Sequence, residues 1–239
     1  DDGNRAQRAD NAGNNSPPSP GLRTRHEPIV PAVRLLSCPM SDALQKWNER
    51  YGTVEYVFGH EPNDFLREHA MNLPRGKVLS LGEGEGRNAV WLASQGFEVW
   101  SIDLSPIGVA KTLKLAEQHG VTVHASVGDL AEYVIEAATW DAIISIFAHT
   151  PPSVRRRIHQ QVVNGLRPGG VYLLEAYSPN QIDYGTGGPK DLSFLPTVEL
   201  LADELSGLQF DLLHEVTRDV IEGALHTGRA AVVQVVARH

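Results

Sequence analysis

The stretch Leu81-Gly82-Glu83-Gly84-Glu85-Gly86-Arg87-Asn88 stands between two contrasting patterns. The apolar run over residues 77–81 predicts a strand, and apolar residues at helical spacing over 87–95 predict a helix. Glycines between them permit positive φ angles and close approach of other groups to the backbone. A glycine-rich turn between a strand and a helix is typical of a nucleotide-cofactor loop. A tight turn that binds no ligand is the alternative interpretation.

The same alternation of strand and helix patterns continues along the chain, which favours repeated βα units and a parallel sheet. Two late strands have no helical pattern between them, which favours an antiparallel pair at a sheet edge. The predicted class is therefore a doubly wound, mostly parallel α/β sheet with helices on both faces. The further strands are predicted at 98–102, 121–126, 141–147, 171–176, 210–220 and 230–237, and the further helices at 107–119 and 153–166.

One domain boundary follows from the composition and patterning of the chain. Residues 1–39 are polar and rich in Pro, Gly and Asn, so we predict a disordered tail that cannot bury enough apolar surface to order itself. Helical spacing begins just after Met40, so we predict a single domain over residues 40–239. The short apolar run at 29–38 is interrupted by Pro31 and Arg34, which disfavours a targeting segment.

Composition narrows the classes of partner. The 239 residues carry a formal net charge of −8, so no broad basic field attracts nucleic acid, and we expect no nucleic-acid partner. No apolar run reaches the ~20 residues of a membrane-spanning helix, so no membrane association is expected. The single Cys38 has no partner for an internal disulfide and no metal-ligand cluster beside it. We therefore predict a cytoplasmic protein without a bound metal.

Two acids follow predicted strands where a nucleotide would lie. Asp103 ends the second strand, 21 residues after Gly82, and is predicted to accept hydrogen bonds from ribose hydroxyls. A helix-capping role is the alternative, although Ser105 is the better cap. Asp129 is predicted to accept from an adenine amino group, with an ordinary turn as the alternative. The G-x-G-x-G spacing departs from the NAD fingerprint, which argues against NAD. An NAD-dependent oxidoreductase is kept as a rival because it shares the strand, the glycine loop and the ribose acid.

Together these features resemble the class I S-adenosylmethionine-dependent methyltransferases, which share a glycine loop, a ribose acid, an adenine acid and a Pro-Gly-Gly turn, here at 168–170. The resemblance covers residues 40–239 and implies a seven-stranded sheet. It implies S-adenosylmethionine as cofactor and S-adenosylhomocysteine as product. Segments 47–51, 62–66, 84–88, 93–99 and 222–234 are similar to the tellurite-resistance methyltransferases, which implies a small-molecule acceptor such as a chalcogen oxyanion or thiol. Cofactor contacts are expected at Gly82, Glu83, Gly84, Gly86, Arg87, Asn88, Asp103, Leu104, Ser105, Asp129, Leu130 and Phe147.

Two positions depart from the family pattern. Ser80 stands where many members carry an acid, and Glu83 stands where they usually carry a small residue. Glu83 is interpreted either as the partner of the cofactor's ammonium group or as a solvated loop acid. Both interpretations stay open at this stage.

The acceptor site is predicted after the fourth and fifth strands. His149 and Tyr177 are the candidate catalytic residues, and a loop histidine without a role is the alternative for His149. A glycine-rich insert at 184–189 is interpreted as a mobile lid or a passive surface loop. A domain that binds the cofactor without catalysis is a further rival, and the sequence does not determine the oligomeric state. Aromatic residues near the start, as candidate pocket or core residues, are Trp47, Tyr51, Tyr56 and Phe58.

Overall fold

A computed structural model describes residues 42–223 and 225–239, which belong to one unit spanning Pro39–His239. The predicted disordered tail, residues 1–39, lies outside the described residues. Within the described ranges, no helix is long and apolar enough to cross a membrane.

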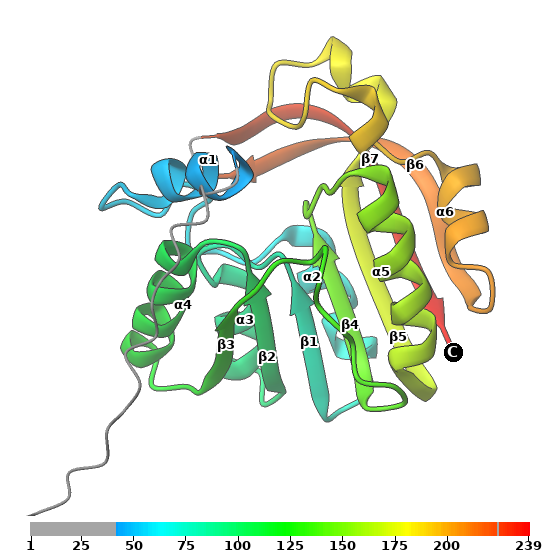
Figure 1. The fold of residues 1–239 in the computed structure, drawn as a ribbon, viewed down its shortest axis with the longest axis horizontal. Helices are drawn as coiled ribbons and strands as arrows, with labels where there is room; N and C mark the ends of the chain where they lie inside the picture. The colour runs from blue at the N-terminus through cyan, green and yellow to red at the C-terminus, as the bar shows by residue number, and fades with distance from the viewer. Residues whose placement is uncertain (1–41, 224) are drawn as a thin grey trace, which may run out of the picture. The chain divides into compact units, whose positions relative to one another are not determined.

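The centre of the fold is one seven-stranded sheet with the strand order β3-β2-β1-β4-β5-β7-β6 (Figure 1). Strands β1 to β5 pair in parallel, whereas β7 runs antiparallel to both β5 and β6. This arrangement confirms the predicted mostly parallel sheet with an antiparallel C-terminal pair. The strands are β1 (Lys77–Leu81), β2 (Glu98–Asp103), β3 (Val123–Val127), β4 (Trp140–Ile146), β5 (Leu166–Tyr177), β6 (Gln209–Glu222) and β7 (His226–Arg238).

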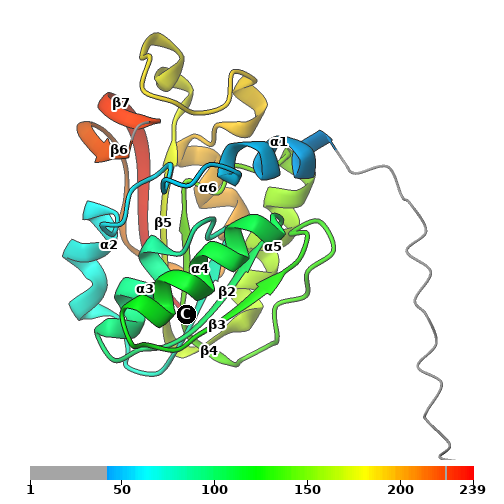
Figure 2. The same cartoon turned by 90° about the vertical axis from the view of Figure 1, so that its left-hand side faces the viewer.

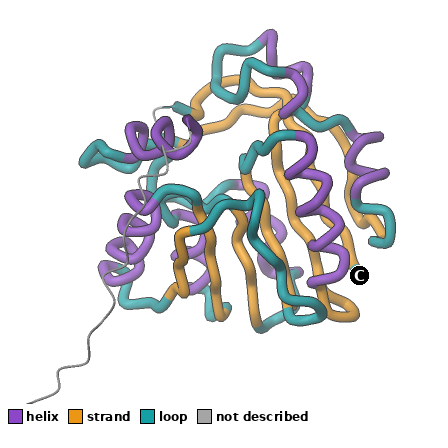
Figure 3. Tube along the Cα trace, viewed as in Figure 1, coloured by secondary structure: helices purple, strands orange, loops and turns teal. Residues whose placement is uncertain are grey.

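Helices cover both faces of this sheet (Figure 3). Alternate residues of the central strands point to opposite faces, so Val78 packs with the cluster that includes α2, α3 and α4, and Leu79 packs with the cluster that includes α5 and α6. The helices are α1 (Asp42–Tyr51), α2 (Asp64–His69), α3 (Arg87–Ser94), α4 (Pro106–Gln118), α5 (Pro152–Gly165) and α6 (Val198–Glu204). Three 3₁₀ helices are η1 (Ala70–Asn72), η2 (Pro179–Asp183) and η3 (Leu192–Phe194).

Several elements differ from the sequence prediction, and β7 begins at His226 rather than 230. Strand β5 begins at Leu166 rather than 171, because Leu166 pairs with Trp140 before the register shifts. Helix α2 was not predicted, and neither was α6. Helix α6 has only seven residues, and its start is marked by Thr197, whose hydroxyl accepts from the amide of Leu200 at 3.2 Å.

The carboxyl ends of the parallel strands define the edge at which the candidate site lies. Helix α1 and the segment that contains η2 and η3 lie at this end of the sheet (Figures 1 and 2). The turn between β6 and β7 reaches the same end, because Tyr177 at the end of β5 pairs with Val232 and β7 continues beyond it. Segments far apart in sequence therefore surround one edge.

Candidate functional site

The glycine loop after β1 is tightly packed against three other segments. Gly82, Gly84 and Gly86 have φ angles of 63°, 70° and 95°, which L side chains rarely adopt. A Cβ atom at Gly82 would lie 2.7 Å from the Cβ of Ala148, and one at Gly84 would lie 2.8 Å from the hydroxyl of Tyr51. Conformation and space therefore both require glycine here.

Asp103 joins the end of β2 to this loop. One carboxylate oxygen accepts from the amide of Gly84 and the other from the amide of Ser105, both at 2.8 Å. Burial raises the pKa of Asp103, and the two amide hydrogen bonds oppose that shift. Each oxygen retains a further lone pair, so the carboxylate can still accept ligand hydroxyl groups. Ser105 caps α4 through Gly108, at 3.2 Å, and the half-buried Leu104 lies between the two.

Glu83 occupies the start of α3. One carboxylate oxygen accepts from the amides of Asn88 and Ala89 at 3.0 and 2.9 Å, and the other accepts from the hydroxyl of Ser80. A carboxylate at a helix N-terminus is favoured by the unpaired amides and the helix dipole. Burial raises the pKa of Glu83, while these donors oppose the shift. The two family departures thus form one hydrogen-bonded pair, with a helix-capping task that neither sequence interpretation included.

Asp129 lies in the turn after β3. Its side chain is exposed and accepts from the amide of Ala131 at 2.7 Å, as in a local Asx turn. The neighbouring Leu130 is half-buried, and its carbonyl accepts from Arg157 on α5 at 2.5 Å. Arg157 on α5 therefore holds this turn in place, and the exposed Asp129 carboxylate can accept further hydrogen bonds.

A buried network of charged and amide side chains connects the start of α3 to the last two strands. Arg87 donates to Glu222 at 2.5 Å, and the amide of Asn63 donates to Glu175 and Glu222 at 2.5 and 2.7 Å. Arg218 binds both oxygens of Glu175, at 2.8 and 2.6 Å. Gln234 also donates to Glu175, at 2.7 Å. These side chains are called the Glu175–Glu222 network, which consists of Asn63, Arg87, Glu175, Arg218, Glu222 and Gln234.

The charges of the Glu175–Glu222 network balance. Burial alone would raise the pKa of Glu222, but the neighbouring His226, the guanidinium of Arg87 and the amide of Asn63 lower it to about 2. Asn88, which follows Arg87 in α3, accepts from the backbone amide of Asn63 at 2.9 Å. Arg87 and Asn88 therefore face the interior of the domain in this structure.

An aromatic cluster lies beside this network. It consists of Phe58, Phe147, Tyr177 and His226, whose neighbouring rings have centroids 4.6 to 5.4 Å apart. His226 is 9% exposed, and its Nδ1, which has no hydrogen-bond partner among the described residues, lies 3.9 Å from Glu222 Oε2. Burial lowers the pKa of His226, although Glu222 opposes the shift. Sequence reasoning assigned no role to His226, although its spacing of four residues from the acid Glu222 was an available signal.

The two predicted catalytic residues lie together at the ends of β4 and β5. The rings of His149 and Tyr177 stack with centroids 5.5 Å apart. The Nδ1 of His149 lies 3.0 Å from the carbonyl of Phe147, and its Nε2 accepts from the backbone amide of Tyr177 at 3.0 Å. Desolvation lowers the pKa of His149 to about 4. Both ring nitrogens are thus occupied by backbone groups.

The glycine-rich insert packs over Tyr177. The hydroxyl of Tyr177 donates to the carbonyl of Thr186 at 3.3 Å, and burial raises the pKa of this hydroxyl. A Cβ at Gly188 would lie 2.8 Å from Cδ2 of the Tyr177 ring. A side chain at position 188 would therefore collide with the Tyr177 ring, which explains why this position is glycine.

The aromatic residues near the start of the domain cover the glycine loop. Tyr51 is 4% exposed and lies against Gly84, with the ring of Trp47 stacked on it at 5.4 Å. Glu85 accepts from the backbone amide of Val57 at 2.8 Å, which anchors the segment before Phe58. The N-terminal segment therefore connects the glycine loop to the aromatic cluster.

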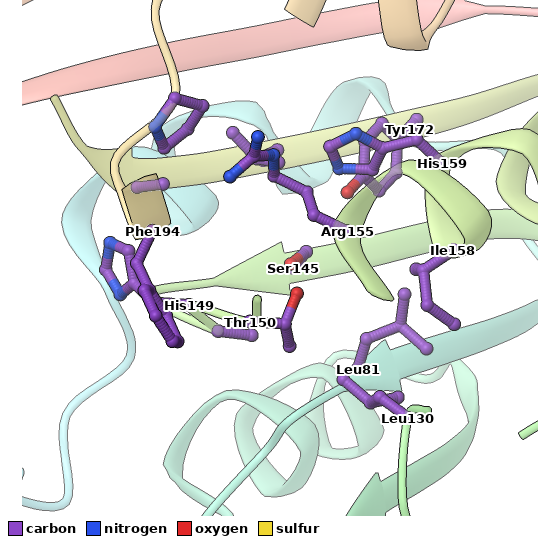
Figure 4. Close-up of a pocket in the computed structure, with 14 residues that line it drawn as sticks. Leu81, Leu130, Ser145, His149, Thr150, Arg155, Ile158, His159, Tyr172 and Phe194 are labelled. Atoms are coloured by element: carbon purple, nitrogen blue, oxygen red, sulfur yellow. The ribbon is translucent and has the colours of Figure 1, made fainter. Parts of the chain in front are cut away.

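A small pocket lies on the α5 side of the sheet (Figure 4). Its free volume of about 20 Å³ suits roughly one water molecule. Leu81 and Leu130 line one side, and the buried hydroxyl of Tyr172, which has no hydrogen-bond partner in the described part of the chain, lines another. This pocket is too small for an organic acceptor.

The comparisons with known proteins agree with this geometry. Residues 78–170 match a protein-family model described as a methyltransferase domain. The fold matches a solved structure titled "Conversion of a Disulfide Bond into a Thioacetal Group during Echinomycin Biosynthesis", with a TM-score of 0.66, 17% identity and coverage of 83% of this chain and 89% of that chain. Residues 78–170 are therefore similar to methyltransferase domains, and the fold is that of the class I methyltransferases. The cofactor of this chain is S-adenosylmethionine, and the NAD-dependent rival is not favoured.

Other similar proteins differ in their substrates. The 2-heptyl-1-hydroxyquinolin-4(1H)-one methyltransferase of Mycobacteroides abscessus is 26% identical over 58% of this chain and 62% of that protein. The tRNA 5-carboxymethoxyuridine methyltransferase of Escherichia coli is 29% identical over 43% of this chain and 40% of that protein. This chain thus spans less than two thirds of each of these relatives. TehB from Haemophilus influenzae shares the methyltransferase fold, with a TM-score of 0.61, 20% identity and coverage of 82% of this chain and 66% of TehB.

The residues of this methyltransferase domain fit the cofactor. Gly82 and Gly84 bring the backbone to the carboxyl end of β1, and Asp103 presents hydrogen-bond acceptors at the neighbouring strand end. Tyr51 lies against the loop with the hydroxyl end of its ring. Among the described residues, no group of three or more His, Cys, Asp or Glu side chains is placed to hold a metal ion.

Proposed function

We propose that this chain transfers the methyl group of S-adenosylmethionine to a small, largely apolar acceptor that carries a protic nucleophile, such as a thiol or an acidic hydroxyl. The observation that carries the proposal is the adjacency of two regions. Gly82 of the glycine loop packs on Ala148, and the preceding residue, Phe147, belongs to the aromatic cluster. A nucleophile at the cluster would therefore lie beside the proposed cofactor site.

The side chains of this site would bind, align and deprotonate the acceptor. When bound, S-adenosylmethionine supplies an already activated methyl group, so the protein mainly has to orient the nucleophile and exclude water. The aromatic cluster suits an apolar acceptor because it buries ring surface. His226 is the proposed proton acceptor, since its lowered pKa keeps the ring neutral near pH 7.

The electrostatics favour this acceptor over an oxyanion. Arg87 and Arg218 are the cations nearest the cluster within the network, and both are paired with buried glutamates. Their field is therefore largely neutralised before an acceptor binds. A chalcogen oxyanion is the second candidate, supported by the resemblance of segments 84–88 and 222–234 to the tellurite-resistance methyltransferases.

An acceptor screen tests the proposal. The full chain is incubated with S-adenosylmethionine and, separately, an alkyl thiol, an N-hydroxy heteroaromatic compound, tellurite, selenite or unmodified tRNA, and S-adenosylhomocysteine is measured. We expect turnover with the thiol or the N-hydroxy compound. Turnover with tellurite or selenite alone would favour the second candidate, and turnover with tRNA alone would exclude a small-molecule acceptor. Cofactor binding without any turnover would favour the non-catalytic module.

A further inference from the structure

The turn after β4 contains a bulky residue in an unfavourable backbone conformation. Phe147 has a φ of 53°, in the left-handed region that glycine favours. Such a conformation persists only where the surrounding structure fixes it, and it often occurs at functional sites. The residues that fix Phe147 therefore identify what this turn is built to do.

Three hydrogen bonds hold the Phe147 turn. The amide of Phe147 donates to the carbonyl of Glu175 at 2.8 Å. The carbonyl of Phe147 lies 3.1 Å from the amide of His149 and 3.0 Å from its Nδ1. His149 thus engages the carbonyl of Phe147 through both its backbone and its side chain.

The second ring nitrogen of His149 reaches the neighbouring strand. Its Nε2 lies 3.0 Å from the amide nitrogen of Tyr177, two residues beyond Glu175, the last residue of β5 that pairs with β4. The ring therefore extends the connection between the two strands past the end of their pairing. A carbonyl only accepts and an amide only donates, so Nδ1 must carry the proton and Nε2 must present its lone pair.

We propose that His149 is a positioning residue, whose imidazole bridges the ends of β4 and β5 and holds Phe147 in the left-handed turn that places its ring in the aromatic cluster. This inference rests on the proposed function for its effect on the acceptor. The Phe147 ring lies 4.6 Å from Tyr177 and 5.0 Å from His226, measured between centroids. Loss of the bridge therefore moves one wall of the acceptor site, while Asp103 keeps its own hydrogen bonds to the amides of Gly84 and Ser105.

Protonation would also break the bridge, because a proton on Nε2 faces the amide hydrogen of Tyr177. The titratable and charged groups that act on His149 are His226 on β7, Arg155 on α5 and Tyr177 on β5. Near pH 7, the ring is in the neutral form that the bridge requires. Acidification toward about pH 4 should disrupt the turn.

Three substitutions separate the two halves of the bridge. His149→Asn retains a donor near the Nδ1 position, His149→Gln retains an acceptor near the Nε2 position, and His149→Leu retains neither. His119→Asn is the matched control, because His119 is an exposed residue at the end of α4. Far-UV circular dichroism checks that each variant folds, and the Asn and Gln variants keep the test informative if the Leu variant does not.

Nuclear magnetic resonance of the ¹⁵N-labelled full chain tests the bridge without requiring activity. We expect His149 in the Nδ1–H tautomer, and we expect His149→Leu to shift the backbone amide signals of Phe147 and Tyr177. An Nε2–H tautomer, or unchanged amide signals in the Leu variant, would overturn the proposal. These readouts stand even if no acceptor is found, so failure of the proposed function is distinguishable.

Kinetics with an acceptor from the screen tests the positioning effect. For His149→Leu we expect kcat/KM for the acceptor to fall by roughly 10- to 100-fold, the scale of a misplaced binding wall, and affinity for S-adenosylhomocysteine to fall by a smaller factor. The Asn and Gln variants should recover part of the loss. Equal losses in all three variants, as for a base that no amide replaces, or no loss in any of them, would contradict the positioning role.

Discussion

The glycine-loop region and the aromatic cluster lie at the same edge of the sheet but are constructed differently. Around the glycine loop, Asp103 and Glu83 fix the backbone through hydrogen bonds to main-chain amides. Around the aromatic cluster, side chains bind side chains, as in the Asn63, Glu175 and Glu222 contacts. The first region is the proposed cofactor cradle, whereas the second is the proposed acceptor site. Changes in the two regions should therefore have separable effects.

The largest expected effect separates turnover from cofactor binding. His226→Gln should lower kcat for a protic acceptor by about 10²- to 10⁴-fold near pH 7, because the proposed proton acceptor is lost. Raising the pH should recover part of the rate as the acceptor ionises by itself. Affinity for S-adenosylhomocysteine, measured by calorimetry, should not change, and His119→Gln is the control. A matching loss of cofactor affinity would remove the distinction between the two regions.

The next effect concerns the stability of the aromatic-cluster side. Glu222→Ala leaves Arg87 buried without its carboxylate partner, so the free energy of unfolding should fall by about 3–5 kcal/mol. The control, Asp211→Ala, removes a partly exposed pair with Arg238 and should cost less than about 1 kcal/mol. Urea denaturation measures both. Equal losses in the two variants would show that the buried network is not strongly coupled.

The same glutamate gives a pH dependence. The pKa of Glu222 in the folded protein is about 2, below its usual value of 4.5. The carboxylate therefore contributes stability that is complete above about pH 4.5 and is lost as the pH falls toward 2. Glu222→Gln should flatten the decline of unfolding free energy in this window. An unchanged slope would contradict the assigned ionisation.

A substitution in the glycine-loop region should have a smaller effect, and this effect should be on the affinity for the cofactor. Asp103→Ala should weaken S-adenosylhomocysteine binding by about 1–3 kcal/mol, the scale of lost charged hydrogen bonds. Asp103→Asn should retain part of the affinity, since its amide oxygen can still accept. Calorimetry decides the matter, and unchanged affinity in the Ala variant would mean that the ribose is not held there.

The smallest expected effect distinguishes two roles of Glu83. Loss of the α3 cap in Glu83→Ala should cost about 1 kcal/mol of stability. If Glu83 only caps the helix, affinities for S-adenosylhomocysteine and for 5′-methylthioadenosine, which lacks the amino-acid part, should change equally. A selective loss for S-adenosylhomocysteine would instead assign Glu83 to the cofactor's ammonium group.

The contrast between the two regions also explains what the sequence could predict. The glycine loop, Asp103 and the Ser105 cap are local patterns, because the residues that interact are near in sequence or follow consecutive strands. The strand pair β6 and β7 was equally readable, since two long apolar patterns have no helix between them. These features were sufficient for the fold class and for the proposed cofactor site.

The aromatic-cluster side could not be derived in the same way. Asn63 and Glu222 are 159 residues apart, and no periodicity indicates that their side chains meet. His149 was predicted from its position as a catalytic residue, but only the structure shows backbone partners at both ring nitrogens. Glu83 departed from the family pattern in a way that became interpretable once Ser80 was seen to bind it.

The most direct test of the proposed function follows the methyl group itself. The full chain is incubated with S-adenosylmethionine that carries a deuterated methyl group, together with a thiol or N-hydroxy acceptor, and the acceptor is analysed by mass spectrometry. The account predicts a labelled acceptor with the unmodified chain and far less with His226→Gln. Heat of binding with NADH, none with S-adenosylhomocysteine, and no labelled acceptor would contradict it.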